Sequence, residues 1–386
     1  MSTPSGQNQP RPLVELALVF LRLGLTAFGG PVAHIALMEQ EFVRNRKWLT
    51  RNELMDLITA TNLIPGPNST ELAIHLGLRR AGWPGLMVSG ACFILPAAFI
   101  TCLLAWAYVR FGKLPEIQGV LYGVKPVIIA VIGQALWRLG GAALKTRWLV
   151  LVSVASVVFC ALGVNQMVVL FGAGLCMLLR SSSSFGEIRR WLVPLPLVGA
   201  GSMVPVLATA AGSGSFSLVS LFGVFLKVGA VLFGSGYVLI ALLRADLVSR
   251  LGWLSEGQLI DAIAVGQITP GPIFSTATFI GYLLGGGPGA VVATVGIFVP
   301  AFLFVALSAP FVGRLRQSVR LGAFLAGANA SALALMAVAG WRLAGSALPD
   351  SVAWMIFVAA TLVLIRFRIN SAWLVLAGAA FGVLAG

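Results

Sequence analysis

The sequence predicts an all-α polytopic membrane protein built from two homologous helical halves, arranged as an inverted-topology repeat with helices broken at Pro-Gly-Pro motifs. Hydrophobic residues make up 59% of the 386 residues and charged residues only 10%, whereas a soluble domain carries about a quarter charged residues. Two Pro-Gly-Pro motifs, 65–67 and 270–272, interrupt apolar segments, because proline removes a backbone donor and clashes with the preceding turn. Such irregular backbone at membrane depth must be buried in protein or line a watery cavity.

The chain begins with a polar stretch, residues 1–12, which has no signal-peptide pattern and is expected to stay in the cytoplasm. A transmembrane helix needs about 20 apolar residues to cross a hydrocarbon core of about 30 Å. By that measure there are thirteen candidate segments, several of them short: 13–36, 54–78, 85–109, 119–137, 148–162, 164–179, 192–211, 217–240, 259–284, 289–309, 321–341, 352–365 and 371–386. The amphipathic stretch 39–51 predicts a helix at the membrane interface.

An internal repeat relates the two halves. Residues 23–30 (LGLTAFGG) resemble 228–235 (VGAVLFGS), and the same spacing superposes the two Pro-Gly-Pro motifs. We therefore expect a first repeat at 13–180, a linker at 181–216 that contains the extra segment 192–211, and a second repeat at 217–386. Because an odd number of segments separates equivalent positions, the second copy is expected to be inverted, as in many carriers.

The net charge of +14 does not indicate a nucleic-acid partner, because the Lys and Arg residues lie in short loops between apolar segments, as the positive-inside rule predicts. Thirteen spans with a cytoplasmic N-terminus place most loop cations inside. Eleven spans in the opposite orientation, with both Pro-Gly-Pro segments re-entrant, give a similar bias, so both topologies stay open. The four cysteines lie in apolar segments without Cys-x-x-Cys spacing, which predicts no metal site, disulfide or cofactor.

Three cations, Arg22, Lys125 and Lys227, lie within apolar segments. A cation at mid-depth costs at least ~2.5–3.5 kcal/mol, so it usually faces a cavity or an opposite charge. Arg22 and Lys227 occupy the same position in the two copies and are predicted to bind an anionic substrate, although Arg22 is near enough to its segment's start to reach the interface. Lys125 is a third candidate, with an anchoring role as the alternative.

Polar residues follow each helix break. The breaks themselves are assigned to Pro65, Gly66 and Pro67 in the first copy and to Pro270, Gly271 and Pro272 in the second. A helix that begins after a break presents unpaired N–H groups and a positive dipole end, which bind oxyanions. The candidate substrate ligands at these helix starts are Asn68, Ser69, Thr70, Ser275 and Thr276. The alternative is that they only cap the helices.

Two glycines in the first segment, Gly29 and Gly30, are predicted to unwind that helix and to let another backbone approach the substrate site. Tight helix packing through small residues is the alternative. The candidates for proton coupling are Glu71, His75, Asp56 and Asp261. Glu71 and His75 are four residues apart and share a helix face, though structural pairing with cations would also explain these residues, and His34 is interpreted as a packing residue.

Three motifs carry a resemblance to a known family: 23–34 (LGLTAFGGPVAH), 62–73 (NLIPGPNSTELA) and 76–83 (LGLRRAGW). With them, and through the second copy to the end, the chain resembles the CHR family of chromate ion transporters. The resemblance implies a multi-pass carrier of the bacterial inner membrane, of the long fused type, that exports chromate and confers resistance. In the second copy Thr276 replaces Glu71 and Ile280 replaces His75, so the first copy is expected to hold most polar ligands.

The expected function is therefore secondary active transport of a tetrahedral oxyanion, chromate with sulfate as the alternative, with a proton as the candidate coupling ion and lipid around the protein. A homodimer is possible, and a sulfate or molybdate importer is the main alternative. An integral-membrane enzyme is disfavoured because the sequence has no catalytic metal spacing, no Gly-x-Ser-x-Gly motif and no Walker motif. A channel is disfavoured because the two copies differ at the candidate ligands.

Overall fold

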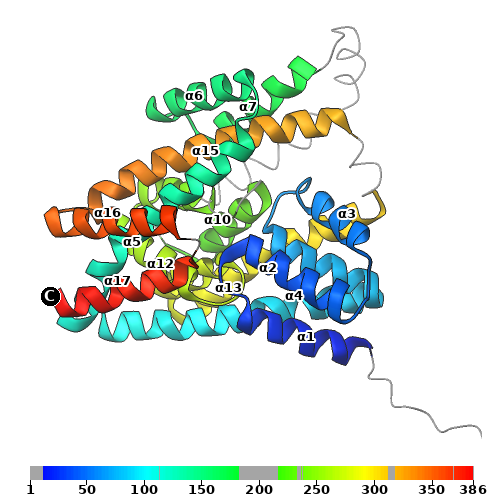
Figure 1. Ribbon diagram of the computed structural model, residues 1–386, viewed down its shortest axis with the longest axis horizontal. Helices are drawn as coiled ribbons and strands as arrows, with labels where there is room; N and C mark the ends of the chain where they lie inside the picture. Colours follow the sequence, from blue (N-terminus) through cyan, green and yellow to red (C-terminus); the bar gives the residue numbers. More distant parts are fainter. Residues whose placement is uncertain are drawn as a thin grey trace, which may run out of the picture.

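The computed structural model describes residues 12–112, 114–181, 216–232, 236, 238–311, 318–367 and 369–385. Within these ranges every regular element is a helix, as predicted, and the long helices lie side by side in one bundle (Figure 1). The expected extra segment 192–211, the polar start 1–11 and residues 233–235 lie outside the described residues. Four helical segments, Asn68–Phe111, Pro115–Ala143, Ile273–Ser308 and Val319–Ala347, are long and apolar enough to cross a membrane.

The first predicted segment, 13–36, is not one continuous span. It is divided into α1 (Pro12–Thr26), α2 (Gly30–Glu39) and the π-helix η1 (Gln40–Asn45). The division falls at Gly29, whose φ of +102° is a left-handed conformation suited to glycine.

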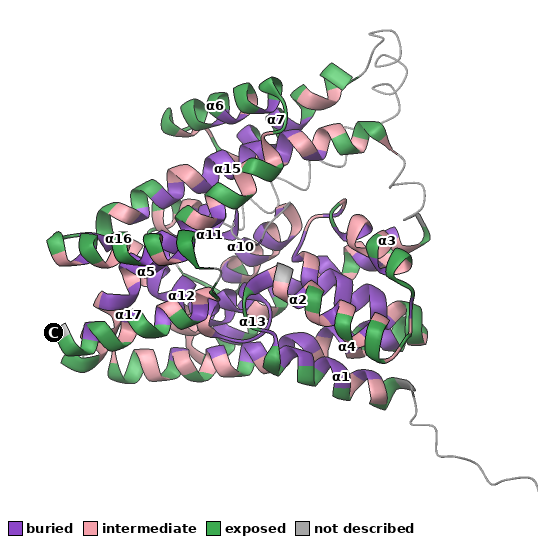
Figure 2. Ribbon diagram, in the orientation of Figure 1, coloured by how far each residue is buried: buried purple, intermediate pink, exposed green. Residues whose placement is uncertain are grey.

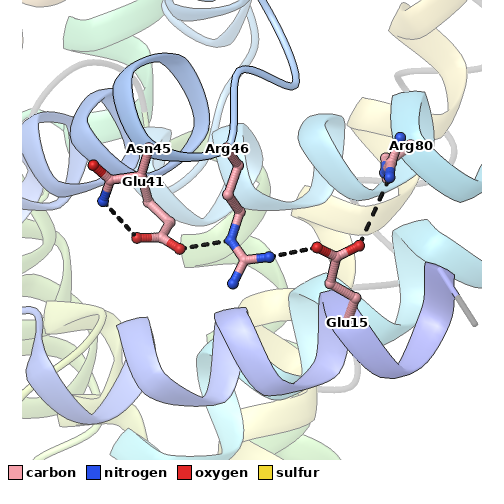
Figure 3. Close-up of polar contacts among 5 residues, drawn as sticks. All are labelled: Glu15, Glu41, Asn45, Arg46 and Arg80. Carbon is pink, nitrogen blue, oxygen red and sulfur yellow. Dashed lines mark hydrogen bonds and ion pairs between the residues drawn. The ribbon is translucent and has the colours of Figure 1, made fainter. Parts of the chain in front are cut away.

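The two arms of this broken segment return to the same side of the bundle. Arg46, just after η1, forms ion pairs with Glu41 and with Glu15 at the start of α1, and Arg80 lies 3.7 Å from the same Glu15 (Figure 3). We call this side the first face. The segment is therefore re-entrant, which corrects the expectation of a crossing helix; the hydropathy of its two arms had hidden the turn between them.

The first Pro-Gly-Pro segment also re-enters. It consists of α3 (Arg51–Thr61), the break, and the beginning of α4 (Asn68–Phe111). α3 begins with a capping box in which Thr50 and Glu53 satisfy each other's backbone N–H groups. An ion pair between Glu53 and Arg79 joins the start of α3 to the end of the first α4 arm, so both ends lie at the first face.

α4 is a helical hairpin rather than one rod. Its backbone leaves the helical conformation at Ala81 and Gly82, and a Cβ on Gly77 would collide with the carbonyl of Gly85 and with Ser89. The arms 68–80 and 83–111 are therefore antiparallel, and only the second runs across the bundle. The crossing helix α5 (Pro115–Ala143) and the shorter apolar helices α6 (Arg147–Ala161) and α7 (Gln166–Ser181) complete the first copy.

The second copy repeats this architecture. Its elements are α10 (Leu218–Val231), α11 (Val238–Leu243), η2 (Arg244–Arg250), α12 (Glu256–Ile268), η3 (Ile273–Ser275), α13 (Thr276–Ser308), η4 (Ala309–Phe311), α15 (Val319–Ala347), α16 (Ser351–Arg366) and α17 (Ser371–Ala385). α13 turns back at Gly285 and Gly286 with nearly the same dihedral angles as α4. A 2.7 Å hydrogen bond between Thr278 and Thr294 joins its two arms.

The second copy is inverted relative to the first. Tyr108, close to the far end of α4, donates a 2.9 Å hydrogen bond to Asp261 in the second turn of α12. α12 therefore begins at the side where α4 ends, opposite the first face. We call that side the second face, and the finding confirms the predicted inverted repeat.

Burial follows from this arrangement. Side chains at the centre of the bundle, on α11, α12 and the inner sides of α4 and α13, are buried, whereas α6, α16 and α17 expose much of their length (Figure 2). The exposed residues are largely apolar, such as Leu95, Phe99 and Leu103 on α4. An apolar surface of this extent requires an apolar surrounding, so this is the surface that faces lipid.

Candidate functional site: the junction of the four helix breaks

The four helix breaks meet in the middle of the bundle. The N–H of Gly66 in the first Pro-Gly-Pro motif donates a 2.7 Å hydrogen bond to the carbonyl of Leu232, where α10 ends. Reciprocally, the N–H of Gly271 in the second motif donates a 2.8 Å hydrogen bond to the carbonyl of Ala27, where α1 ends. These are equivalent positions exchanged between the copies, so a pseudo-two-fold axis passes between them. We call this region the break junction.

Glycine is required at both motif centres. Gly66 has a φ of +141° and Gly271 a φ of +89°, conformations that other residues rarely adopt. A Cβ on Gly271 would lie 2.8 Å from the Cβ of Ala97, and a Cβ on Gly66 would collide with the carboxyl group of Glu71. The flanking prolines lie in the non-helical stretches between α3 and α4 and between α12 and η3, as expected for helix breaks.

The start of α4 brings buried polar groups to the junction. Ser69, Thr70, Glu71 and His75 are all at most 4% exposed. Among the described residues, the hydroxyl of Thr70, both carboxyl oxygens of Glu71 and Nε2 of His75 have no hydrogen-bond partner. Burying a polar atom without a hydrogen bond costs folding free energy. A proton, a water molecule or a polar ligand bound at the junction would therefore be stabilised by these groups.

Two further polar side chains near this helix start, those of His34 and Asn68, form hydrogen bonds, although the amide oxygen of Asn68 is buried without a partner among the described residues. His34 bridges the first break to α4: its Nε2 donates to the carbonyl of Ala27 over 3.0 Å, so its Nδ1 accepts from the hydroxyl of Ser69 over 3.1 Å. His34 is thus a hydrogen-bonded link as well as a packing residue. Asn68 donates to Asn62 over 2.5 Å, which closes the non-helical stretch on itself.

The second copy contributes fewer free polar groups. Thr276 donates to the carbonyl of Ile273 over 2.8 Å and so serves as a local cap, whereas the buried hydroxyl of Ser275 has no partner among the described residues. A cavity of about 10 Å³ lies beside Gln267 and Thr276, about the size that holds one water. This cavity has no room for a tetrahedral oxyanion.

The predicted glycines of the first break lie at contacts between distant segments. A Cβ on Gly29 would lie 3.1 Å from the amide nitrogen of Asn370, in the turn before α17. A Cβ on Gly30 would lie 3.5 Å from Ile273 of the second copy. Both glycines therefore permit close approach, which agrees with either of the roles considered for them.

The structure places the predicted cations separately. Lys227 forms an ion pair with the buried Asp246 and lines a cavity. Its equivalent, Arg22, is exposed and lies near Glu41, whose pKa is lowered chiefly by the hydrogen bond from Arg46 and to a small extent by Arg22. The cavity lined by Lys227 does not include Arg22, so the two cations do not meet at one site.

Lys125 and Asp261, predicted for different roles, are partners of one another. Their charged atoms are 3.6 Å apart, and Tyr108 also donates to Asp261. Because Asp261 belongs to the second copy and the other two to the first, this cluster joins the copies near the second face. Asp56, at the equivalent position on α3, is half-buried.

Comparison with known proteins gives a coherent result. The sequence model of the family described as Chromate transporter matches residues 14–178 and again residues 219–383. A chromate transport protein of Cupriavidus metallidurans is 33% identical over 98% of this chain and 95% of its own length. One from Pseudomonas aeruginosa is 32% identical over 87% of this chain and 82% of its own. A probable chromate transport protein of Synechococcus elongatus is 32% identical over 84% of this chain and 83% of its own length. No solved structure matches the chain.

Proposed function

The chain belongs to the chromate transporter family, and we propose that it is a secondary active transporter that exports chromate across the bacterial inner membrane and so confers chromate resistance. The observation that carries this proposal is the reciprocal pair of hydrogen bonds at the break junction, Gly66 to Leu232 and Gly271 to Ala27. An inverted repeat with broken helices at its symmetry axis is the arrangement in which two halves can rock around a midplane site.

The break junction offers suitable groups for a tetrahedral dianion. The start of α4 supplies N–H donors and a positive dipole end, and the hydroxyls of Thr70 and Ser275, which have no partner among the described residues, can donate to oxygen. The carboxyl of Glu71 lies among them with no partner in the part of the chain that the structure describes. An ionised carboxylate beside a dianion would be strongly repelled, so we propose that Glu71 is protonated whenever the anion is bound, with His75 one turn along the helix as its proton exchange partner.

Orientation follows from the cations of the described chain. We place Arg22, Arg44, Arg46, Lys47, Arg51, Arg79, Arg80, Arg138, Lys145, Arg147, Arg180 and Arg320 towards the first face, and Arg110, Lys125, Lys227, Arg244, Arg250 and Arg342 towards the second. By the positive-inside rule the first face is cytoplasmic, as is the N-terminus. We propose that Arg22 and Lys227 each attract the anion at their own face.

Membrane potential favours export. Moving one elementary charge across 100 mV is worth about 2.3 kcal/mol, so a dianion that leaves a cell with a negative interior gains about twice that amount. A proton carried along with the anion would reduce the gain by half and would couple flux to the pH gradient as well. Such proton symport would also suit a sulfate or molybdate importer, which is why the direction of flux must be measured.

The test is chromate exchange by the purified protein in proteoliposomes, with membrane potential, pH gradient and competing sulfate varied independently. We expect outward chromate flux to rise with an inside-negative potential. Glu71→Gln should retain exchange but lose its pH dependence, whereas Glu116→Gln, the same change at an exposed acid of α5, should behave as the parent protein. An unaltered pH profile in Glu71→Gln would return Glu71 to a structural role, and net uptake driven by the proton gradient would favour the importer.

A further inference from the structure

A cavity of about 290 Å³ lies at the second face, between α7, α10, η2 and α15. Its charged and amide lining residues are Asn165, Gln166, Lys227, Arg244, Asp246, Arg250 and Arg342. A cavity of this volume has room for a tetrahedral oxyanion together with several water molecules.

The cavity carries an excess of positive charge. Asp246, its only acidic lining residue in the described chain, is 6% exposed and pairs with both Lys227 and Arg250, the latter at 3.1 Å. Arg244 is held by Glu256 through its Nε at 3.0 Å. Arg342 has no ion pair among the described residues. The two carboxylates, of Asp246 and Glu256, therefore neutralise only two of the four cations. The remaining net charge of about +2 matches the charge of a dianion.

The beginning of α7 faces the same cavity. Asn165 precedes the helix and accepts a 2.9 Å hydrogen bond from the N–H of Met167, while the side-chain oxygen of Gln166 is buried without a partner among the described residues. The 16-residue helix adds its positive dipole end to the cationic lining. Cations and helix dipole thus converge on one hollow.

The corresponding place in the first copy has only two of these four cations, Arg22 and Arg138. Glu39 and Asn45 stand where the second copy has Arg244 and Arg250. The difference opposes the general bias of cations towards the first face, so charge placement for membrane insertion does not explain it. A binding role at the second face does.

We propose that this cavity is a second oxyanion site, separate from the break junction, which takes a doubly charged tetrahedral oxyanion such as sulfate or chromate at the second face. The proposal that an oxyanion binds there rests on the lining residues of the cavity alone and not on the proposed function. The role of the cavity as the point of anion release, outside the cytoplasm, rests on the proposed function and its orientation.

Direct binding tests the site. Radiolabelled sulfate is the probe for the purified protein in detergent, because it has the shape and charge of chromate without its oxidising power. We expect Arg342→Gln to weaken sulfate binding about tenfold, as for the loss of one charge-assisted hydrogen bond. The matched control is Arg138→Gln, because Arg138 is the exposed equivalent of Arg342 in the first copy. Equal affinity in both variants would overturn the site.

Two further readouts separate this proposal from the transport mechanism. Arg342→Gln should keep the pH dependence of transport that is assigned to Glu71, because Arg342 lines the cavity. Cys160 also lines the cavity, so a variant that keeps only this cysteine should react with a membrane-impermeant maleimide added outside intact cells, and sulfate should slow the reaction. Labelling from outside without protection by sulfate would contradict an anion site, and labelling only from the cytoplasmic side would contradict the orientation.

Discussion

Substitution of Gly66 by alanine tests the break junction most directly. Gly66 has a φ of +141°, its N–H donates to Leu232 of the other copy, and a Cβ would collide with the carboxyl of Glu71. The unfavourable backbone costs about 1–3 kcal/mol, and loss of the inter-copy hydrogen bond adds about 0.5–1.5 kcal/mol. Displacement of Glu71 then removes the proton site from the junction. We expect Gly66→Ala to lower chromate exchange at least tenfold.

The matched control is Gly82→Ala. Gly82 also has a positive φ, +63°, but a Cβ there would meet nothing within 4 Å, so this variant shares the backbone strain and no collision. Thermal unfolding of both purified proteins measures the strain, and exchange per folded molecule in proteoliposomes measures the junction. If Gly66→Ala transports as well as Gly82→Ala, the breaks are structural turns and the substrate path lies elsewhere.

Two further predictions concern the charged pairs. Lys125→Met leaves Tyr108 as the only partner of the buried Asp261 among the described residues, so we expect the free energy of unfolding to fall by about 3–5 kcal/mol. In a double-mutant cycle, adding Asp261→Asn should restore part of this loss. A double variant whose loss equals the sum of the two single losses would refute the pairing. The second pair is that of Glu53 and Arg79. Hydrogen bonds from the backbone N–H of Thr50 and then from Arg79 lower the pKa of Glu53 from 4.5 to about 2. Its stabilising contribution is therefore present above about pH 4.5 and lost as pH falls towards 2, and the acid limb of the unfolding temperature should flatten in Glu53→Gln.

The sequence predicted the inverted repeat because equivalent motifs keep a constant spacing and a broken helix has a chemical signature in proline and glycine. It did not predict that the first segment re-enters. Both arms of 13–36 are apolar, and hydropathy does not distinguish a segment that crosses the membrane from one that turns back within it. The deciding contact, Glu15 with Arg46, joins residues whose proximity depends on the turn at Gly29.

The site was only partly accessible from sequence. The helix start and the position of Glu71 in its first turn were expected from the break, because a local motif generates both; that Glu71 has no cation partner among the described residues was not. The link between Tyr108 and Asp261 was missed, since it joins two copies through packing that no short motif encodes. The cationic cavity was missed because Arg244, Arg250 and Arg342 had each been assigned to loops, where positive charge is ordinary; only their convergence on one hollow distinguishes them.

The inverted repeat carries a further consequence for the transport cycle, because exchanging the conformations of the two halves generates the opposite state. In the present state Cys160 lines the cavity beside Lys227, whereas its equivalent in the second copy, Leu364, is 4% exposed. The opposite state should therefore close the cavity around Cys160 and open one around Leu364 near Arg22. In a Leu364→Cys variant, conditions that raise maleimide labelling at position 364 should lower it at Cys160. Parallel changes at the two positions would show that the halves open together, as in a channel, and not in alternation.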